Sequence, residues 1–161
     1  MGNNNRRHQL TLTHLFDAGD EMSFGGKPNT DVNTTILGNG WPDLSTDEFR
    51  NVRRIPTVFD NDSMEMAIRI ASKAVKKQLV SLLDEAGQPP QLDEDETAIY
   101  KRAVYGRAHG DLLPEFATQD RRKEANNAAT DEADQQDRFF TQSTRDTRQL
   151  LGLGRASVGV I

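Results

Sequence analysis

The stretch DSMEMAIRIASKAVKKQLVSLLDEAG, residues 62–87, decides the fold. Good helix formers fill it, Asp62 or Ser63 can cap its start, and Gly87 with the prolines that follow ends it. On a wheel of 3.6 residues per turn one face is small or apolar: Ala67, Ala71, Ala74, Val75 and Leu82. The opposite face is basic: Arg69, Lys73, Lys76 and Lys77. We therefore predict an amphipathic helix over residues 64–85 with a basic back.

Two further helices flank this one. Upstream, Ser45 and Glu48 have the spacing of a capping box, in which hydroxyl and carboxylate each bind an otherwise unpaired amide. A short helix to about Arg54 follows, and Pro56 stops it. Downstream, the four carboxylates of residues 93–96 favour the positive end of a helix dipole, so a third helix is expected to begin there. Pro114 is expected to kink or end it.

The third and fourth helices carry faces suited to close contact. On the third, small residues alternate with large ones, which allows another backbone to approach: Ile99, Ala103, Gly106, Gly110 and Leu113. The fourth is predicted over residues 121–151, and Gly152 and Gly154 stop it. Its stripe comprises Ala125, Ala128, Ala129, Gln136, Phe139, Phe140, Thr147, Leu150 and Leu151.

The predicted architecture is mainly α, a small bundle of about four helices over residues 41–151. Residues 1–40 have a turn-like composition and are expected to form an extended N-terminal arm. Two short alternations in this arm, around Leu10 and over residues 32–37, can become strands if a partner supplies an edge. Residues 152–161 form an extended tail that ends on apolar, β-prone residues, which suggests that something receives it.

Composition narrows the function. The chain of 161 residues has the size of one domain, but only 35% of it is apolar, so part of it is expected to lie outside any core of its own. Its formal net charge of −5 argues against a general nucleic-acid binder, although a local basic stripe remains compatible with one. Cysteine is absent, which excludes disulfides, and no run is apolar enough for a membrane span.

No catalytic or metal-binding pattern is present, so we expect neither an enzyme nor a cofactor. His8, His14 and His109 lack metal-ligand spacing and have no matched acid partner. The Gly25, Gly26, Lys27 sequence lacks the spacing of a phosphate loop and is interpreted as a turn. The carboxylates of residues 93–96 point in different directions around a helix end and favour capping over calcium binding.

Two charged sets are candidate contact sites. The basic stripe of Arg69, Lys73, Lys76 and Lys77 can meet DNA or an acidic neighbour, or it can be a solvated face. The acidic residues Asp131, Asp134 and Asp137 are most simply solubilising. If their helix lines a channel, these charges would repel a passing polyanion.

The order of these segments resembles a known family. The Trp41, Pro42, Asp43 sequence leads into a short basic helix, then come the amphipathic helix to Gly87, the run Tyr100, Lys101, Arg102, Ala103, Val104, and the charged helix to Leu151. A Gly-Arg pair and an apolar end complete it. Over residues 41–161 the chain is similar to the head-completion proteins of contractile-tailed temperate phages, called protein L.

That resemblance implies a structural adaptor of the virion, built in the host cytoplasm. It implies a ring of twelve copies beneath the portal, which extends the DNA channel toward a downstream neck or tail-terminator protein. Genomic DNA would pass through without sequence-specific binding. The tail would dock on the portal through Arg155, Val158, Val160 and Ile161. The basic stripe would meet an acidic face of the next subunit, because ring contacts join two different surfaces.

Two other classes stay open at this point. A stopper or tail terminator is typically rich in β-strand, whereas strand signals here lie at the two ends of the chain. A helical DNA-binding regulator or small-terminase-like packaging protein would need duplex affinity that falls steeply with salt.

Overall fold

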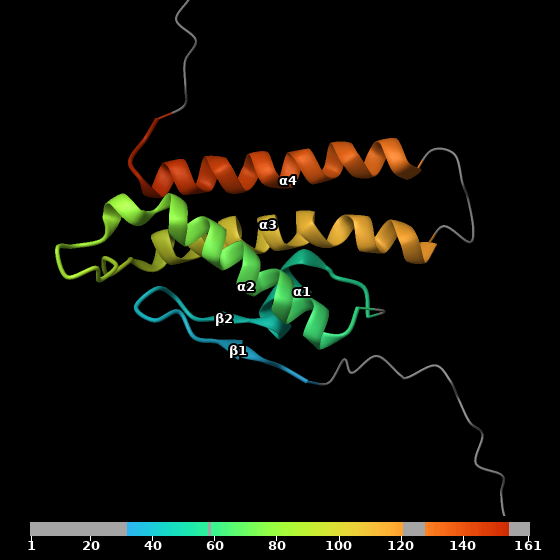
Figure 1. The fold of residues 1–161 in the computed structure, drawn as a ribbon, viewed down its shortest axis with the longest axis horizontal. Coiled ribbons are helices and arrows are strands. Elements are labelled where there is room, and N and C mark those ends of the chain that lie inside the picture. Colours follow the sequence, from blue (N-terminus) through green and yellow to red (C-terminus); the bar gives the residue numbers. More distant parts are fainter. Residues whose placement is uncertain (1–31, 58, 121–127, 155–161) are drawn as a thin grey trace, which may run out of the picture.

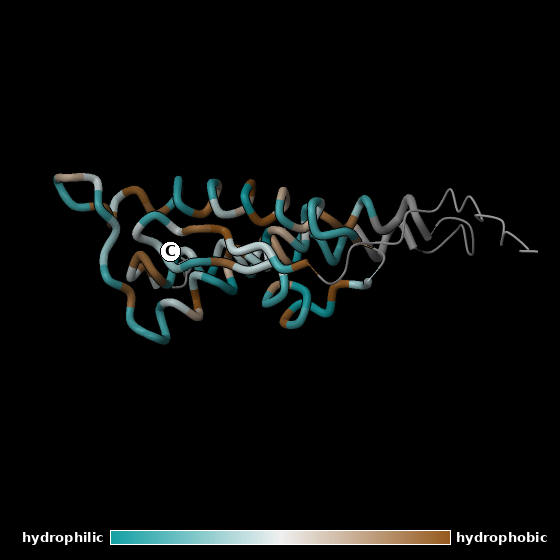
Figure 2. The backbone as a smooth tube through the Cα atoms, turned by 90° about the horizontal axis from the view of Figure 1, so that it is seen from below, coloured by the Kyte–Doolittle hydropathy of each residue, from teal (hydrophilic) through white to brown (hydrophobic). Residues whose placement is uncertain are grey.

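The fold is a helical bundle with one helix at its centre. The computed structural model describes residues 32–57, 59–120 and 128–154. Helix α3 (Glu94–Asp120) is central, α4 (Ala128–Leu150) runs antiparallel along one side, and α1 (Thr46–Arg53) and α2 (Asn61–Gln78) cover the other with a small hairpin, as Figure 1 shows. Figure 2 shows hydrophilic and hydrophobic residues alternating along the helices, as amphipathic helices require. The mainly α prediction is confirmed.

Helix α2 is the predicted amphipathic helix, with shifted ends. Its cap is Asp60, whose carboxylate accepts a hydrogen bond from the Ser63 amide at 2.7 Å, so the predicted cap at Asp62 or Ser63 is wrong. The helix ends at Gln78 and not at residue 85, because the chain tightens into a 3-10 turn, η1 (Val80–Leu82). Gly87, with φ of +75°, instead closes a later turn.

The core lies between α2, α3, α1 and the hairpin. Ala67, Ala71 and Val75 of the predicted apolar face are buried, and Ala74 and Leu82 are partly buried. Aromatic rings complete this core: Trp41 stacks on Tyr100 with centroids 5.3 Å apart, and Phe49 lies 5.5 Å from Tyr105. Since these rings come from α1, α3 and the segment before α1, they join elements distant in sequence.

Helix α1 keeps half of its predicted capping box. The Ser45 hydroxyl accepts from the Glu48 amide at 3.1 Å, as expected. The Glu48 carboxylate does not return to the Ser45 amide, because Tyr105 of α3 lies between them. The Tyr105 hydroxyl accepts from Ser45 N at 3.0 Å and donates to Glu48 Oε2 at 2.8 Å. Burial raises the pKa of this phenol. Lys101 completes the site with an ion pair to Glu48 at 2.9 Å.

Part of the predicted arm packs on the bundle. Strand β1 (Thr35–Ile36) pairs antiparallel with β2 (Leu44–Ser45), so the edge for the strand predicted near residues 32–37 comes from the same chain. The Ile36 side chain is buried, and Asn61 at the start of α2 donates to Thr34 Oγ1 at 2.8 Å. Residues 1–31, including the alternation around Leu10, lie outside the described part of the chain.

Pro114 does not end α3, which continues to Asp120. A proline inside a helix leaves the carbonyl four residues earlier without its amide donor. Here that carbonyl belongs to Gly110, and Gln136 Nε2 of α4 donates to it at 2.9 Å. The glycine also has no side chain to crowd the proline. Of the predicted kink or end at Pro114, the end is therefore wrong, because a neighbouring helix supplies the missing donor.

Helix α4 ends as predicted at Gly152. The Gly152 amide donates to Gln149 O at 3.0 Å and the Leu153 amide donates to Arg148 O at 2.9 Å, while Gly152 has φ of +67°. This pattern is a Schellman motif. Residues 121–127 of the predicted fourth helix lie outside the described residues, and the helix is described from Ala128 to Leu150.

Candidate assembly surface

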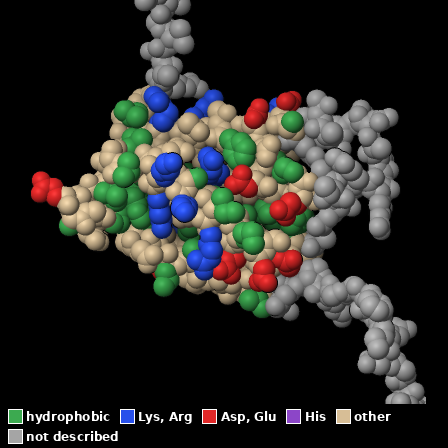
Figure 3. Space-filling model, viewed as in Figure 1, with side chains coloured by type: hydrophobic (Ala, Val, Ile, Leu, Met, Phe, Trp, Pro, Cys, Tyr) green, Lys and Arg blue, Asp and Glu red, His purple; other side chains and the backbone are tan. Residues whose placement is uncertain are grey.

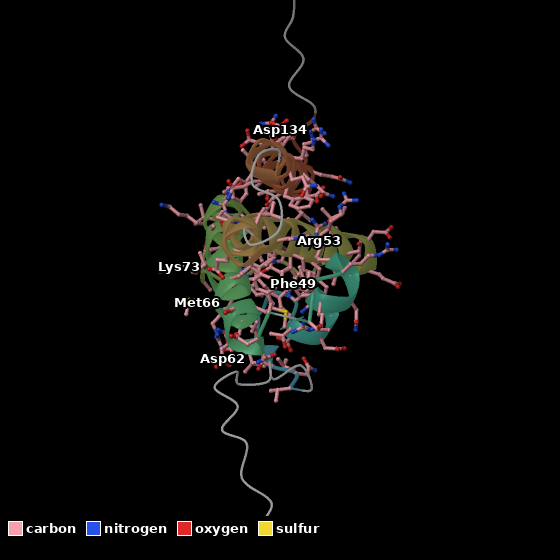
Figure 4. The ribbon with its side chains drawn as sticks, turned by 90° about the vertical axis from the view of Figure 1, so that its right-hand side faces the viewer. Phe49, Arg53, Asp62, Met66, Lys73 and Asp134 are labelled. Atoms are coloured by element: carbon pink, nitrogen blue, oxygen red, sulfur yellow. The ribbon has the colours of Figure 1, made fainter. Side chains whose placement is uncertain are left out.

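The outward face of α2 exposes two large apolar side chains. Met66 is 64% exposed and Ile70 is 58% exposed, although Met64 and Ile68 beside them are buried. Figure 4 shows Met66 and Lys73 along the outer side of this helix. Exposed apolar side chains that neighbour one another on a helix are candidates for contact with another protein. We call Met66, Ile70, Lys73 and Lys77 the α2 outer face.

The four cations of the predicted basic stripe have different surroundings. Arg69 forms an ion pair with Glu65 of the same helix at 2.7 Å. Lys76 donates to Gly38 O at 2.8 Å, and burial lowers the pKa of its ammonium. Lys73 and Lys77 are exposed, and within the described residues neither has an ion pair. The structure therefore leaves two of the four cations available for an acidic neighbour.

A hollow of about 320 Å³ lies beside this face, between the hairpin and α2. Leu37 and Asn39 line one wall, and Arg69, Lys73 and Lys76 line the other. Figure 3 shows Lys and Arg side chains gathered over α2, with Asp and Glu side chains to their right and hydrophobic side chains between. On this face of the molecule the cationic and anionic side chains therefore lie in separate zones.

The predicted channel residues lie away from α2. Asp134 and Asp137 of α4 are exposed, and the side chain of Asp131 is outside the described part. In Figure 4 Asp134 lies at the top of the molecule, whereas Met66 lies below its middle, on the outer side of α2. Because α3 separates α4 from α2, the basic and acidic sets occupy different sides of the subunit. The predicted portal residues Arg155, Val158, Val160 and Ile161 lie outside the described residues.

The contact between α3 and α4 fits the prediction of close backbone approach. A Cβ atom on Gly110 would lie 2.9 Å from the Phe140 ring, and one on Gly106 would lie 3.7 Å from the Phe139 carbonyl oxygen. The glycines of the predicted small-residue face therefore allow the close packing of α4 on α3.

An ion pair in this contact was not predicted. The Arg102 guanidinium donates two hydrogen bonds to Asp146, at 2.8 and 2.7 Å, and Asp146 is buried. This bonding raises the pKa of Arg102. The sequence signal was the continuation of the α4 stripe through Ser143 and Asp146, between Phe140 and Leu150, because these polar residues share the helical spacing of the apolar ones.

A second polar contact joins α1, α3 and α4. Arg53 Nε donates to His109 Nδ1 at 3.3 Å, and the His109 ring stacks on Phe139 with centroids 4.6 Å apart. Burial lowers the pKa of His109 to about 4, and the nearby Arg53 charge acts in the same direction. His109 therefore serves as a neutral packing residue.

The described part of the chain shows no grouping that could hold a metal ion. Within the same residues, no helix is both long and apolar enough to cross a membrane. His8, His14 and Lys27 fall outside what the structure describes.

Known proteins resemble this chain over most of its length. A curated relative, the "Probable head completion/stabilization protein" of Haemophilus phage HP1 (strain HP1c1), is 30% identical over 151 residues, an alignment covering 86% of this chain and 99% of the relative. No solved structure matches the chain. The family model described as "Phage head completion protein (GPL)" matches residues 38–161, which is most of the sequence. The chain therefore belongs to the phage head completion protein family.

Proposed function

We propose that this chain is an adaptor subunit that assembles as a ring, of twelve copies, beneath the portal of a tailed phage. The ring extends the DNA channel toward the next neck or tail-terminator protein, and genomic DNA passes through without sequence-specific binding. Subunits fold in the host cytoplasm and join the particle. Family membership supports the coarse part of this proposal, since the family comprises phage structural proteins and is not an enzyme family.

The observation that supports a ring is the exposure of the α2 outer face. Met66 and Ile70 are exposed on a helix whose other side is fully packed, and Lys73 and Lys77 flank them without ion pairs among the described residues. A ring uses two different surfaces of each subunit. In this proposal the α2 outer face of one copy meets Asp and Glu side chains of the next copy. Asp134 and Asp137 lie on the side of the subunit that lines or borders the channel.

Energetics explain why such a ring would need the portal as a template. Burying the exposed parts of Met66 and Ile70 contributes about 1–2 kcal/mol each. Association of two free subunits costs at least about 4 kcal/mol in lost translational and rotational freedom. A single contact is therefore too weak for a stable free dimer, whereas subunits held side by side on a portal gain it at high effective concentration.

The tail supplies the portal contact in this proposal. The Schellman motif at Gly152 fixes the direction in which the chain leaves α4, and Arg148 Nη2 donates to Gly154 O at 3.0 Å. The residues beyond, with Arg155, Val158, Val160 and Ile161, dock on the portal. A deletion of residues 155–161 is therefore a sharper test than one from 152, because it keeps the helix end intact.

The decisive experiment is size-exclusion chromatography with light scattering, on the chain alone and mixed with portal rings. We expect a monomer alone and a ring of chains on the portal. Deletion of residues 155–161 should abolish co-elution with the portal. Retained binding after this deletion would refute the docking role of the tail.

A pair of surface variants tests the subunit contact. Met66→Asp with Ile70→Asp should leave the monomer folded and reduce ring occupancy on the portal. Val52→Asp on α1 is the matched control, because Val52 is 62% exposed and lies outside the α2 outer face. Equal occupancy for the two variants would exclude the α2 outer face as the subunit contact.

A further inference from the structure

Strand β1 has a free edge. In the β1–β2 pair, Thr46 N donates to Thr34 O. The Ser45 N–H donates to the Tyr105 hydroxyl at 3.0 Å, and the Ser45 carbonyl oxygen lies 3.4 Å from the same hydroxyl, so both Ser45 groups face away from β1. Thr35 lies opposite Ser45 in the register, so its own N–H and C=O point away from β2. Within residues 32–57, 59–120 and 128–154, neither group has a hydrogen-bond partner. An edge strand of this kind is a template for another extended chain.

The hollow described above lies beside this strand. Leu37, two residues after Thr35 and therefore in the same backbone orientation, is 67% exposed and lines it. The opposite wall carries Arg69, Lys73 and Lys76 of α2. The site therefore combines unpaired strand backbone, one apolar side chain and positive charge. It fits an extended acidic segment with some apolar residues.

The other parts of a second copy fit this site poorly. Helices have used their own backbone groups and cannot pair with a strand edge. A second β1 would bring the cations of two α2 helices face to face. Of the three stretches outside the described residues, 121–127 (RRKEANN) and 155–161 (RASVGVI) carry net positive side-chain charge. Residues 15–24 (LFDAGDEMSF) carry three carboxylates and no Lys or Arg.

We propose that residues 15–24 of a neighbouring copy pair with the β1 edge and lie in the hollow beside α2. This inference rests on the proposed ring and names a second contact within it. The intervening residues 25–32 can span at most about 27 Å when fully extended. Backbone hydrogen bonds to Thr35 and Leu37 would set the register, and Asp17 and Glu21, which share one face of an extended segment, would face the cations.

Cysteine cross-linking tests this contact directly, since the chain has no cysteine of its own. Chains carrying Ala18→Cys and chains carrying Leu37→Cys are mixed, assembled on portal rings and treated with a short bismaleimide. We expect linked chain pairs at a yield at least about fivefold above a mixture of Ala18→Cys with Val52→Cys, because the docked segment raises the local concentration at residue 37. Val52 is matched to Leu37 in exposure.

Two cross-linking results would overturn the proposal. One is equal yield at positions 37 and 52. The other is a link within a single chain, which is detected by diluting a chain that carries both Ala18→Cys and Leu37→Cys in cysteine-free chains. Such a link would place residues 15–24 on the β1 strand of their own chain. If rings form on the portal without the link, this inference fails while the proposed function stands.

A peptide titration decides the matter without the portal. An acetylated peptide of residues 13–24 is added to the full ¹⁵N-labelled chain at low salt. We expect the Thr35 and Leu37 amide resonances to shift, and affinity to fall at least about threefold in Lys73→Glu but not in Lys77→Glu, which does not line the hollow. Unchanged resonances at these two amides, or equal binding by a peptide with its three carboxylates neutralised, would overturn the inference. If no ring forms on the portal, the proposed function fails and this titration alone decides the inference.

Discussion

The two sides of α3 are packed by different chemistry. Toward α1, α2 and the hairpin it presents Tyr100 and Tyr105, which stack on other rings within an apolar core. Toward α4 it presents Gly106, Gly110 and Arg102, and the contact contains hydrogen bonds and an ion pair. The first side is stabilised mainly by apolar burial and the second by close approach and polar pairing. Substitutions on the two sides should therefore fail for different reasons.

The largest effect is expected on the apolar side. Ile68→Ala removes a fully buried side chain of α2 and should lower the free energy of unfolding by about 3 kcal/mol, from lost burial and the cavity left behind. Chemical denaturation measures this change. Ile70→Ala on the same helix is the control, because Ile70 is exposed and its loss should change stability by less than about 0.5 kcal/mol. Similar losses in both variants would contradict the orientation of α2.

On the polar side the ion pair should respond asymmetrically. Arg102→Met leaves the Asp146 carboxylate buried without its partner and should cost about 2 kcal/mol, whereas Asp146→Ala should cost about 1 kcal/mol. The difference arises because the Arg102 side chain is 51% exposed and can return to water, while that of Asp146 is 4% exposed. Denaturation of both variants at neutral pH checks this order, and the reverse order would show that Asp146 reaches solvent.

The polar side should also give the protein a pH dependence. Burial lowers the pKa of His109 from 6.5 to about 4, so between these values the unfolded chain binds the proton and the folded chain does not. Stability is therefore complete above pH 6.5 and falls as the pH drops toward 4, by up to about 1.5 kcal/mol after allowing for the partial exposure of the ring. Denaturation of the chain and of His109→Gln at pH 7 and pH 4.5 isolates this contribution, because the variant should lack it.

The apolar side was the easier one to predict from the sequence. The period of residues 67–75 placed the buried face of α2 correctly, because apolar spacing is set by helix geometry alone. The ends of α2 were predicted wrongly because local turns set them. At the start of the helix, for example, Asp60 is the cap and Asp62 is not. The hairpin could not be placed, because strands of two residues carry almost no periodic signal.

The polar contacts of α3, on both of its sides, required information that no local pattern contains. The Glu48 carboxylate was expected to cap its own helix, but Tyr105, which is 57 residues away in sequence, takes that position. Pro114 was expected to kink or end its helix, and only the position of Gln136 on α4 explains why the helix continues. The family, by contrast, was recognisable from the order of the segments, and the match over residues 38–161 confirms it.

The smallest effects on stability are expected at Gly106 and Gly110 of α3, which the sequence pattern does not distinguish. Gly106→Ala should stabilise the protein by up to about 1 kcal/mol, because alanine favours the helix and its methyl group would meet the Phe139 carbonyl oxygen at an ordinary 3.7 Å. Gly110→Ala should destabilise the protein by about 1 kcal/mol, because the methyl group would lie 2.9 Å from the Phe140 ring and push α4 outward. This movement would also lengthen the hydrogen bond from Gln136 to the Gly110 carbonyl. Thermal unfolding of the two variants side by side measures both signs. If Phe140→Leu restores the stability of Gly110→Ala, the contact with the Phe140 ring is the cause of the loss. If both alanine variants are more stable than the unchanged protein, α4 packs less closely on α3 than the glycine geometry indicates.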